Sequence, residues 1–108
     1  MNEVNQIVDT PRERAMHIIR ELVSGRLEGI PSKVYLIGSC ARGDDKRSSD
    51  IDIAIETLQP TPKALIADIR DMLEQSDVPF FVDVFDFTQL DENYRTQIEK
   101  DGVLWIAP

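Results

Sequence analysis

The sequence contains little of what builds disulfides, zinc sites or membrane spans. Its one cysteine, Cys40, cannot form an internal disulfide, which is typical of a protein in a reducing cytoplasm. One cysteine and one histidine cannot supply the ligands of a zinc site, and we expect the histidine, His17, at the surface or at the edge of the core. No apolar run approaches the ~20 residues of a transmembrane helix, and the N-terminus lacks the features of a signal peptide. We therefore expect a cytoplasmic protein that has no membrane partner.

Positive charge is also scarce. Lysine and arginine number 12 against 20 aspartates and glutamates, which gives a formal net charge of −8. This balance argues against nucleic acid as a partner, because nucleic-acid binding depends on cations that neutralise phosphates. Residues 33–47 depart from it, with four basic side chains against the two acids Asp44 and Asp45. That excess suits a loop that meets phosphate, and it suits a solvated loop of mixed charge equally well.

The length and the apolar patterning predict a single α/β domain over residues 1–108, in which residues 1–9 form a loose lead-in. Thr10, Pro11 and Glu13 have the pattern of a helix N-cap with a capping box. Helices then alternate with short strands, so we expect a small mixed β-sheet with helices packed on one face. The expected strands cover residues 34–37, 51–55 and 80–85. A second helix is expected to begin at residues 61–63 and a last helix to cover about 91–101, and an apolar tail covers 103–106. The expected buried stripes are Ala15, Ile18, Ile19, Leu22 and Val23 in the first helix, and Leu65, Ile66, Ile69, Met72 and Leu73 in the second.

The most informative motif joins a glycine-serine turn to a pair of aspartates. Gly38 and Ser39 directly follow an expected strand, and after ten more residues Asp50 and Asp52 stand one residue apart. Because side chains alternate along a strand, both carboxylates lie on one face while the neighbouring isoleucines face the core. Glycine lets the backbone approach a phosphate closely, so Gly38, Ser39 and Arg42 are candidate phosphate ligands. Each half of the motif alone is also common in plain turns and solvated strands.

A third acid strengthens the functional interpretation. Asp83 lies within the strongly apolar stretch 80–87, where a charge must be paired, bound to metal or neutralised. Asp86 is the competing candidate on the opposite face of the same strand, and periodicity does not choose between the two because both faces are largely apolar.

If three carboxylates converge here, they need a compensating cation. Two unit charges about 4 Å apart repel by roughly 4 kcal/mol at an effective dielectric constant of 20. Carboxylate oxygens are the ligands that Mg²⁺ and Mn²⁺ prefer, and these ions also bind the phosphates of a substrate. The sequence therefore favours a magnesium or manganese site beside a phosphate-binding turn.

With these residues in view, the chain resembles the minimal nucleotidyltransferases of the DNA polymerase β-like nucleotidyltransferase superfamily. Gly38, Ser39, Asp50 and Asp52 fit the family's Gly-Ser, ten-residue, Asp-x-Asp pattern, and the likeness covers roughly residues 12 to 106. The family's third carboxylate lies between two hydrophobic strand residues, which matches Asp83 rather than Asp86. The resemblance implies the nucleotidyltransferase fold, whose small sheet is like the palm of polymerase β.

The resemblance also implies a two-metal reaction on a nucleoside triphosphate. Asp50 and Asp52 would bind both ions, and Asp83 would complete one metal site and help to activate the attacking hydroxyl. Gly38 and Ser39 would grip the triphosphate of ATP, with Arg42 nearby.

The partner implied by the family is a small helical protein of the HEPN or substrate-binding-subunit kind. The expected reaction transfers AMP to a tyrosine of that partner, as in toxin–antitoxin pairs, since the chain has little length left for an acceptor domain. The alternative is a non-catalytic module that neutralises or assists its partner by binding. Transfer to RNA or to a small molecule fits the charge and the length less well. Val103, Leu104 and Trp105 could contribute to the partner interface, or they could close the core.

Overall fold

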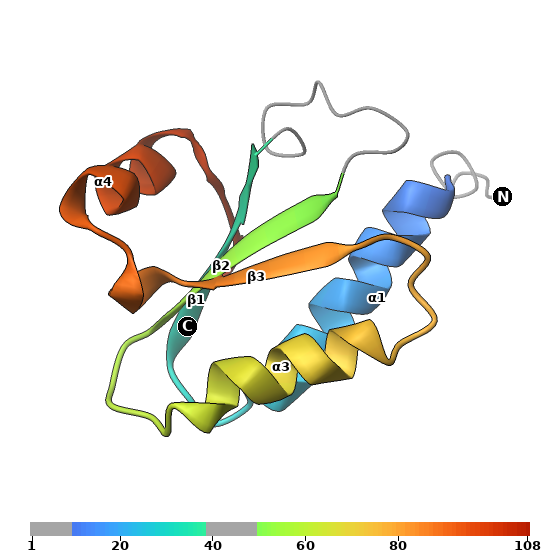
Figure 1. Ribbon diagram of the computed structural model, residues 1–108, viewed down its shortest axis with the longest axis horizontal. Coiled ribbons are helices and arrows are strands. Elements are labelled where there is room, and N and C mark those ends of the chain that lie inside the picture. Colours follow the sequence, from blue (N-terminus) through green and yellow to red (C-terminus); the bar gives the residue numbers. More distant parts are fainter. Residues whose placement is uncertain (1–9, 39–49) are drawn as a thin grey trace, which may run out of the picture.

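Four strands form one mixed sheet at the centre of the structure, a computed structural model that describes residues 10–38 and 50–108 (Figure 1). β1 pairs antiparallel with β2 and with β4, whereas β2 and β3 are parallel. A parallel pair needs a crossover connection, and α3 (Ala64–Glu74) supplies it. The predicted small mixed sheet is thus confirmed. The strands are β1 (Ser32–Ile37), β2 (Ile51–Thr57), β3 (Val82–Asp86) and β4 (Val103–Ile106), in the order β3-β2-β1-β4.

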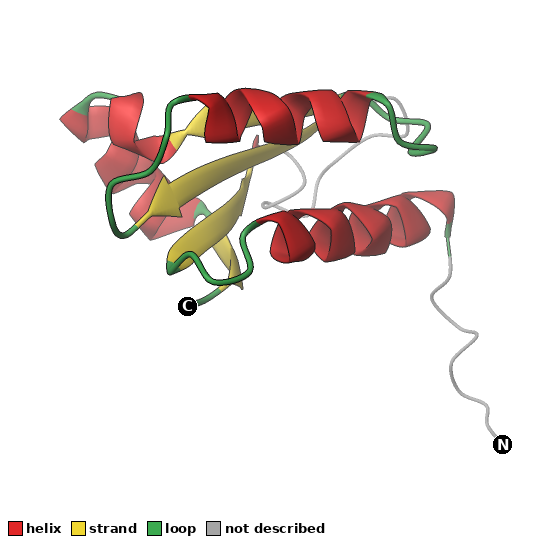
Figure 2. Ribbon diagram, turned by 90° about the horizontal axis from the view of Figure 1, so that it is seen from below, coloured by secondary structure: helices red, strands yellow, loops and turns green. Residues whose placement is uncertain are grey.

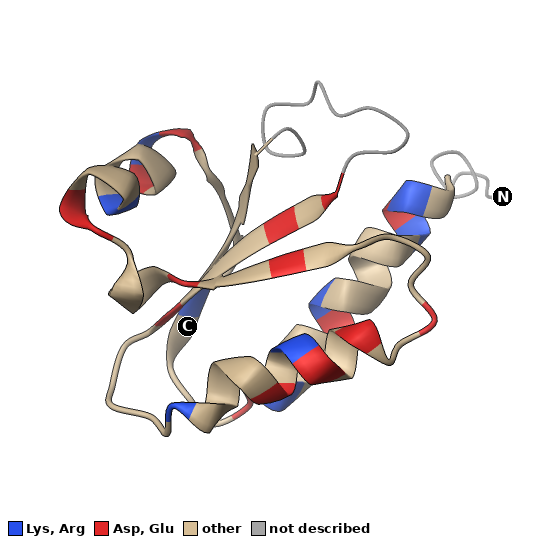
Figure 3. Ribbon diagram, in the orientation of Figure 1, with Lys and Arg blue, Asp and Glu red and all other residues tan. Residues whose placement is uncertain are grey.

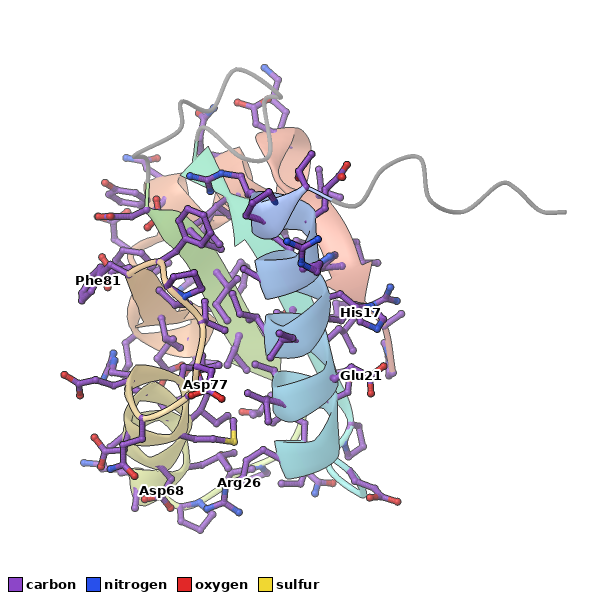
Figure 4. The ribbon with its side chains drawn as sticks, turned by 90° about the vertical axis from the view of Figure 1, so that its right-hand side faces the viewer. His17, Glu21, Arg26, Asp68, Asp77 and Phe81 are labelled. Atoms are coloured by element: carbon purple, nitrogen blue, oxygen red, sulfur yellow. The ribbon has the colours of Figure 1, made fainter. Side chains whose placement is uncertain are left out.

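Two helices, α1 (Pro11–Arg26) and α3, lie side by side and cover one face of the sheet (Figure 2). The first begins as predicted, because the Thr10 hydroxyl accepts a hydrogen bond from the Glu13 N–H and the Glu13 carboxylate accepts one from the Thr10 N–H. Near its other end, Arg26 pairs with Asp68 of α3 at 2.9 Å (Figure 4). The main core lies between these helices and the sheet. Its fully buried side chains are Ile19, Val23, Val34, Ile51, Ile53, Ile55, Ile69 and Val84.

The other face of the sheet is covered only in part, by the short 3₁₀ turn η2 (Phe87–Gln89) and by α4 (Glu92–Asp101). A small second cluster joins these elements to the sheet. It contains Tyr35, Ala54, Phe87 and Ile98, and the rings of Tyr35 and Phe87 stack with their centres 5.5 Å apart. The sequence predicted the helix over 91–101, but nothing in its pattern indicated that it packs against the polar face of β2.

Some expectations about individual apolar residues need correction. Ile18 was expected in the buried stripe of α1, yet it is 42% exposed, because Ala15, Ile19 and Val23 at four-residue spacing take the face that meets the sheet. The third strand begins at Val82 rather than at residue 80. Phe80 instead lies under the Arg12 guanidinium at 4.6 Å, and Phe81 is 64% exposed and points away from the ribbon (Figure 4). His17 lies at the surface of α1, as expected, and its Nε2 atom is 3.8 Å from Oε2 of Glu21 (Figure 4).

The apolar tail forms β4, an edge strand beside β1. Trp105 and Ile106 pack against the main core, so part of the tail closes the core. Val103 and Leu104 are 43% and 50% exposed and remain available for contact. None of the helices in residues 10–38 and 50–108 is long and apolar enough to cross a membrane.

Candidate active site

The glycine-serine turn comes directly against the aspartate pair. Gly38 follows β1, and its neighbour Ile37 is the register partner of Asp52 on β2. Gly38 has a φ of +75°, a left-handed backbone conformation that residues with a side chain rarely adopt. A Cβ atom at this position would lie 2.7 Å from Asp52 Oδ2. The backbone conformation and the close approach therefore both require glycine here.

Asp52 and Asp83 face each other across the parallel pair. They are register partners on β2 and β3, so their backbones lie at the inter-strand spacing of about 4.8 Å and their side chains share a face. Figure 3 shows acidic positions side by side on these two strands. Asp50 lies just before β2 and is exposed. Asp52 and Asp83 thus share one face of the sheet, and Asp50 lies just before the strand that carries Asp52.

Asp86, the competing third acid, has a different environment. It pairs in register with Ile55, and its Oδ1 accepts hydrogen bonds from the Thr88 N–H at 3.0 Å and from the Thr88 hydroxyl at 2.7 Å. These contacts make it the N-cap of η2. Its position in the sequence therefore has a structural explanation.

The electrostatics of Asp52 link the three acids. The pKa of its carboxyl is raised above the usual aspartate range, first by burial and then by the negative charges of Asp83 and Asp50. Within the described residues, no three His, Cys, Asp or Glu side chains form a group that could hold a metal ion, so the convergence of three carboxylates on a metal stays a prediction. Carboxylates such as Asp52 and Asp83 are the ligand type that Mg²⁺ and Mn²⁺ prefer, and these ions commonly complete their coordination with water and substrate phosphates.

Arg70 of α3 fixes the strand that carries Asp83. Its Nε and Nη2 atoms donate to the Val84 carbonyl oxygen at 3.1 and 2.9 Å. This oxygen belongs to β3, an edge strand of the sheet, and Val84 is buried. The guanidinium therefore satisfies a backbone acceptor on the residue next to Asp83 and holds that strand in place.

A cavity of about 330 Å³ opens beside Asp52 on the face that α4 covers in part. Gly38 and Asp52 lie at its wall together with residues of α4, none of which the sequence had indicated as functional. The motif predicted one wall of this cavity, whereas the other depends on the packing of α4, which no local pattern reveals. The remaining lining residues are Ile37, Phe85, Tyr94, Gln97, Ile98, Asp101 and Gly102.

Two predicted phosphate ligands, Ser39 and Arg42, lie outside the described residues. Gly38 is the described member of that group. Its close approach is to the Asp52 carboxylate, and its role as a phosphate ligand stays a prediction.

Comparisons with known proteins show the family and the fold of the chain. Residues 25–107 match the family model described as "Polymerase beta, Nucleotidyltransferase". A Haemophilus influenzae protein described as "Probable protein adenylyltransferase MntA" is 31% identical over 67 residues, which are 62% of this chain. The match spans 59% of the length of that relative.

Two solved structures are similar in fold. A toxin–antitoxin complex with AMP-PNP has a TM-score of 0.65 at 22% identity, over 82% of this chain and 73% of its own. A complex of a tri-AMPylated HEPN toxin from Shewanella oneidensis with its MNT antitoxin has a TM-score of 0.64 at 19% identity, over 92% of this chain and 74% of its own. The family model covers most of the chain and the predicted fold agrees with these structures, so this chain belongs to the polymerase β-type nucleotidyltransferase family.

Proposed function

We propose that this protein transfers AMP from ATP to a hydroxyl group of a protein acceptor. The observation that carries the proposal is that Gly38 leaves no room for a side chain beside Asp52, which in turn faces Asp83. A turn without a side chain, set against a carboxylate pair, suits a triphosphate and the cations that accompany it. Ser39 and Arg42 are proposed to bind the same triphosphate, from the sequence alone.

The proposed reaction is an in-line displacement at the α-phosphorus. The bond from the acceptor oxygen to the α-phosphorus forms as the bond between the α- and β-phosphates breaks, and pyrophosphate leaves. Asp83 would accept the proton of the attacking hydroxyl. Asp50, Asp52 and Asp83 would hold two ions, Mg²⁺ or Mn²⁺, which when bound stabilise negative charge on the entering and leaving oxygens. The raised pKa of Asp52 supports this assignment, because bound cations would stabilise the ionised carboxylate against burial and against its acidic neighbours.

The relatives support the choice of nucleotide and acceptor. One is described as a protein adenylyltransferase, one similar complex contains AMP-PNP, and another contains a HEPN toxin that carries AMP groups. By analogy, we propose ATP as the substrate and a tyrosine of a helical HEPN-type protein as the acceptor. This chain would then act in the cytoplasm as the antitoxin of a toxin–antitoxin pair.

Label transfer tests the activity. The chain is incubated with α-labelled ATP, Mg²⁺ and the helical protein encoded beside it, and protein-bound label is counted. We expect label on the partner with the parent chain and little with Asp83→Asn. Asp86→Asn is the matched control on the same strand, because asparagine can still cap η2 and Asp86 lies outside the proposed site. Equal labelling by the parent chain and Asp83→Asn would exclude the proposed role of this acid.

A non-catalytic antitoxin is the competing interpretation, and the exposed Val103 and Leu104 of β4 are compatible with it. The double variant Asp50→Asn, Asp52→Asn separates the two in cells. Catalytic neutralisation predicts that this variant fails to suppress the toxicity of the partner. Full suppression would favour neutralisation by binding alone.

A further inference from the structure

The cavity between Asp52 and α4 has walls suited to a nucleoside. Its volume of about 330 Å³ lies at the lower end of the range for small-molecule sites, about 300–1,000 Å³. Phe85, Ile37 and Ile98 supply apolar surface, and Tyr94, a residue that is 63% exposed, adds an aromatic ring. Planar bases bind well between aromatic and aliphatic side chains because every base has a π face.

A polar pair stands at the same cavity. The Gln97 side chain donates a hydrogen bond to Asp101, four residues further along α4, which orients its amide. A glutamine amide has a second N–H and a carbonyl oxygen for other partners. Adenine offers a donor and an acceptor side by side at N6 and N7, and an amide pairs with both, whereas guanine offers two acceptors at the corresponding positions.

Among the described residues, one cavity contains Asp52 and another contains Asp83, and their linings differ. The cavity beside α4 contains Gly38 and Asp52, whereas a second one of about 280 Å³ contains Asp83 and Phe81 at the edge of β3. The proposed function assigns Gly38 to the triphosphate, Asp52 to the metal ions that accompany it, and Asp83 to the proton of the acceptor hydroxyl. The cavity beside α4 therefore lies on the nucleotide side of the site.

We propose that α4 forms the base-binding wall of this enzyme, in which Tyr94 stacks on the adenine ring and Gln97 binds its N6–N7 edge. The inference rests on the proposed function and assigns specificity for the base to residues outside the catalytic motif. The phosphates would bind without Tyr94 and Gln97, and the base would not.

The test compares two ligands that share the phosphates. Binding of Mg²⁺–ATP and of Mg²⁺–tripolyphosphate is titrated on the parent chain and on Tyr94→Ala, Tyr94→Phe and Gln97→Ala, and KM and kcat are measured for ATP and GTP. We expect Tyr94→Ala to raise the Kd and KM for ATP about tenfold, the effect of one lost stacking contact, with tripolyphosphate binding and saturated kcat unchanged. Tyr94→Phe keeps the ring and should behave like the parent chain. Gln97→Ala should reduce the preference for ATP over GTP.

The outcomes separate this inference from the proposed function. If the parent chain transfers AMP, Asp52→Asn does not, and Tyr94→Ala leaves the KM for ATP unchanged, the base lies elsewhere and only the inference fails. If Tyr94→Ala weakens tripolyphosphate as much as ATP, or raises the KM of the protein acceptor instead, the assignment of the base to α4 is also wrong. If the parent chain binds neither ligand, the proposed function and the inference both fail. Because Tyr94 is largely exposed, its truncation should leave the melting temperature nearly unchanged, which is checked in parallel.

Discussion

Replacement of Gly38 by alanine should reduce activity far more than stability. The φ of +75° makes any L side chain costly, by about 1–2 kcal/mol in the free energy of unfolding. The new Cβ would also stand 2.7 Å from Asp52 Oδ2, well inside contact distance. The side chain of Asp52 can rotate away from this clash, so the collision displaces a proposed catalytic carboxylate rather than the backbone. A misplacement of about 1 Å in such a site can reduce the rate about 100-fold.

Gly29→Ala is the matched control for this prediction. Gly29 has a φ of +83°, but a Cβ there meets no atom within 4 Å. Both variants should therefore lose about 1–2 kcal/mol in urea unfolding, the shared cost of the left-handed backbone. Only Gly38→Ala should lose label transfer. Equal activity in the two variants would refute the claim that the contact of Gly38 with Asp52 matters for catalysis.

Three further predictions concern stability. Gly102→Ala should lower the free energy of unfolding by about 1–3 kcal/mol, because its Cβ would lie 2.7 Å from the Ile98 carbonyl oxygen. Gly25→Ala should raise the free energy of unfolding by about 0.5–1 kcal/mol, because Gly25 lies within α1 and a Cβ there meets no atom within 4 Å; urea titrations compare the two variants. Arg70→Met should cost about 1–3 kcal/mol in the same assay, since it leaves the buried Val84 carbonyl oxygen without its charged donor; an unchanged midpoint would show that this contact is dispensable. The pKa of Asp52 is raised in the folded state, so the folded chain holds this proton to a higher pH than the unfolded chain does, and stability falls as pH rises from the ordinary aspartate pKa through the raised one. Asp52→Asn should remove this loss of stability with rising pH. At neutral pH without divalent metal it should melt at a higher temperature than the parent chain, and a lower melting temperature would contradict the charge repulsion.

Local patterns predicted the parts of the fold that depend on local interactions. The capping box of Thr10 and Glu13 is formed by residues three apart, and the burial of the β2 isoleucines on one face follows from strand geometry. Ala54 of β2, on the opposite face, is also buried, in the second cluster, and alternation did not indicate this. Ile18 was misassigned because an apolar residue at the margin of a helix stripe can face either the core or solvent. The side on which α4 packs depends on residues far apart in the sequence, such as Ile98 of α4 with Tyr35 and Ala54 of the sheet, and periodicity does not encode this.

The candidate site shows the same division. Spacing and the family resemblance selected Gly38, Asp50, Asp52 and Asp83, although strand periodicity alone could not separate Asp83 from Asp86. The parallel register that sets Asp83 opposite Asp52, and the contact of Gly38 with that carboxylate, are products of tertiary packing. Tyr94 and Gln97 had no signal in the sequence, because their relevance comes only from the packing of α4 beside Asp52. The roles of all these residues in catalysis and binding stay predictions.

The most direct test of the central claim is the intact mass of the helical partner protein after incubation with this chain, ATP and Mg²⁺. The account predicts a mass increase of one or more AMP groups with the parent chain and with Asp86→Asn, and no increase with Asp52→Asn. An unchanged mass with the parent chain, or an equal increase with Asp52→Asn, would contradict it.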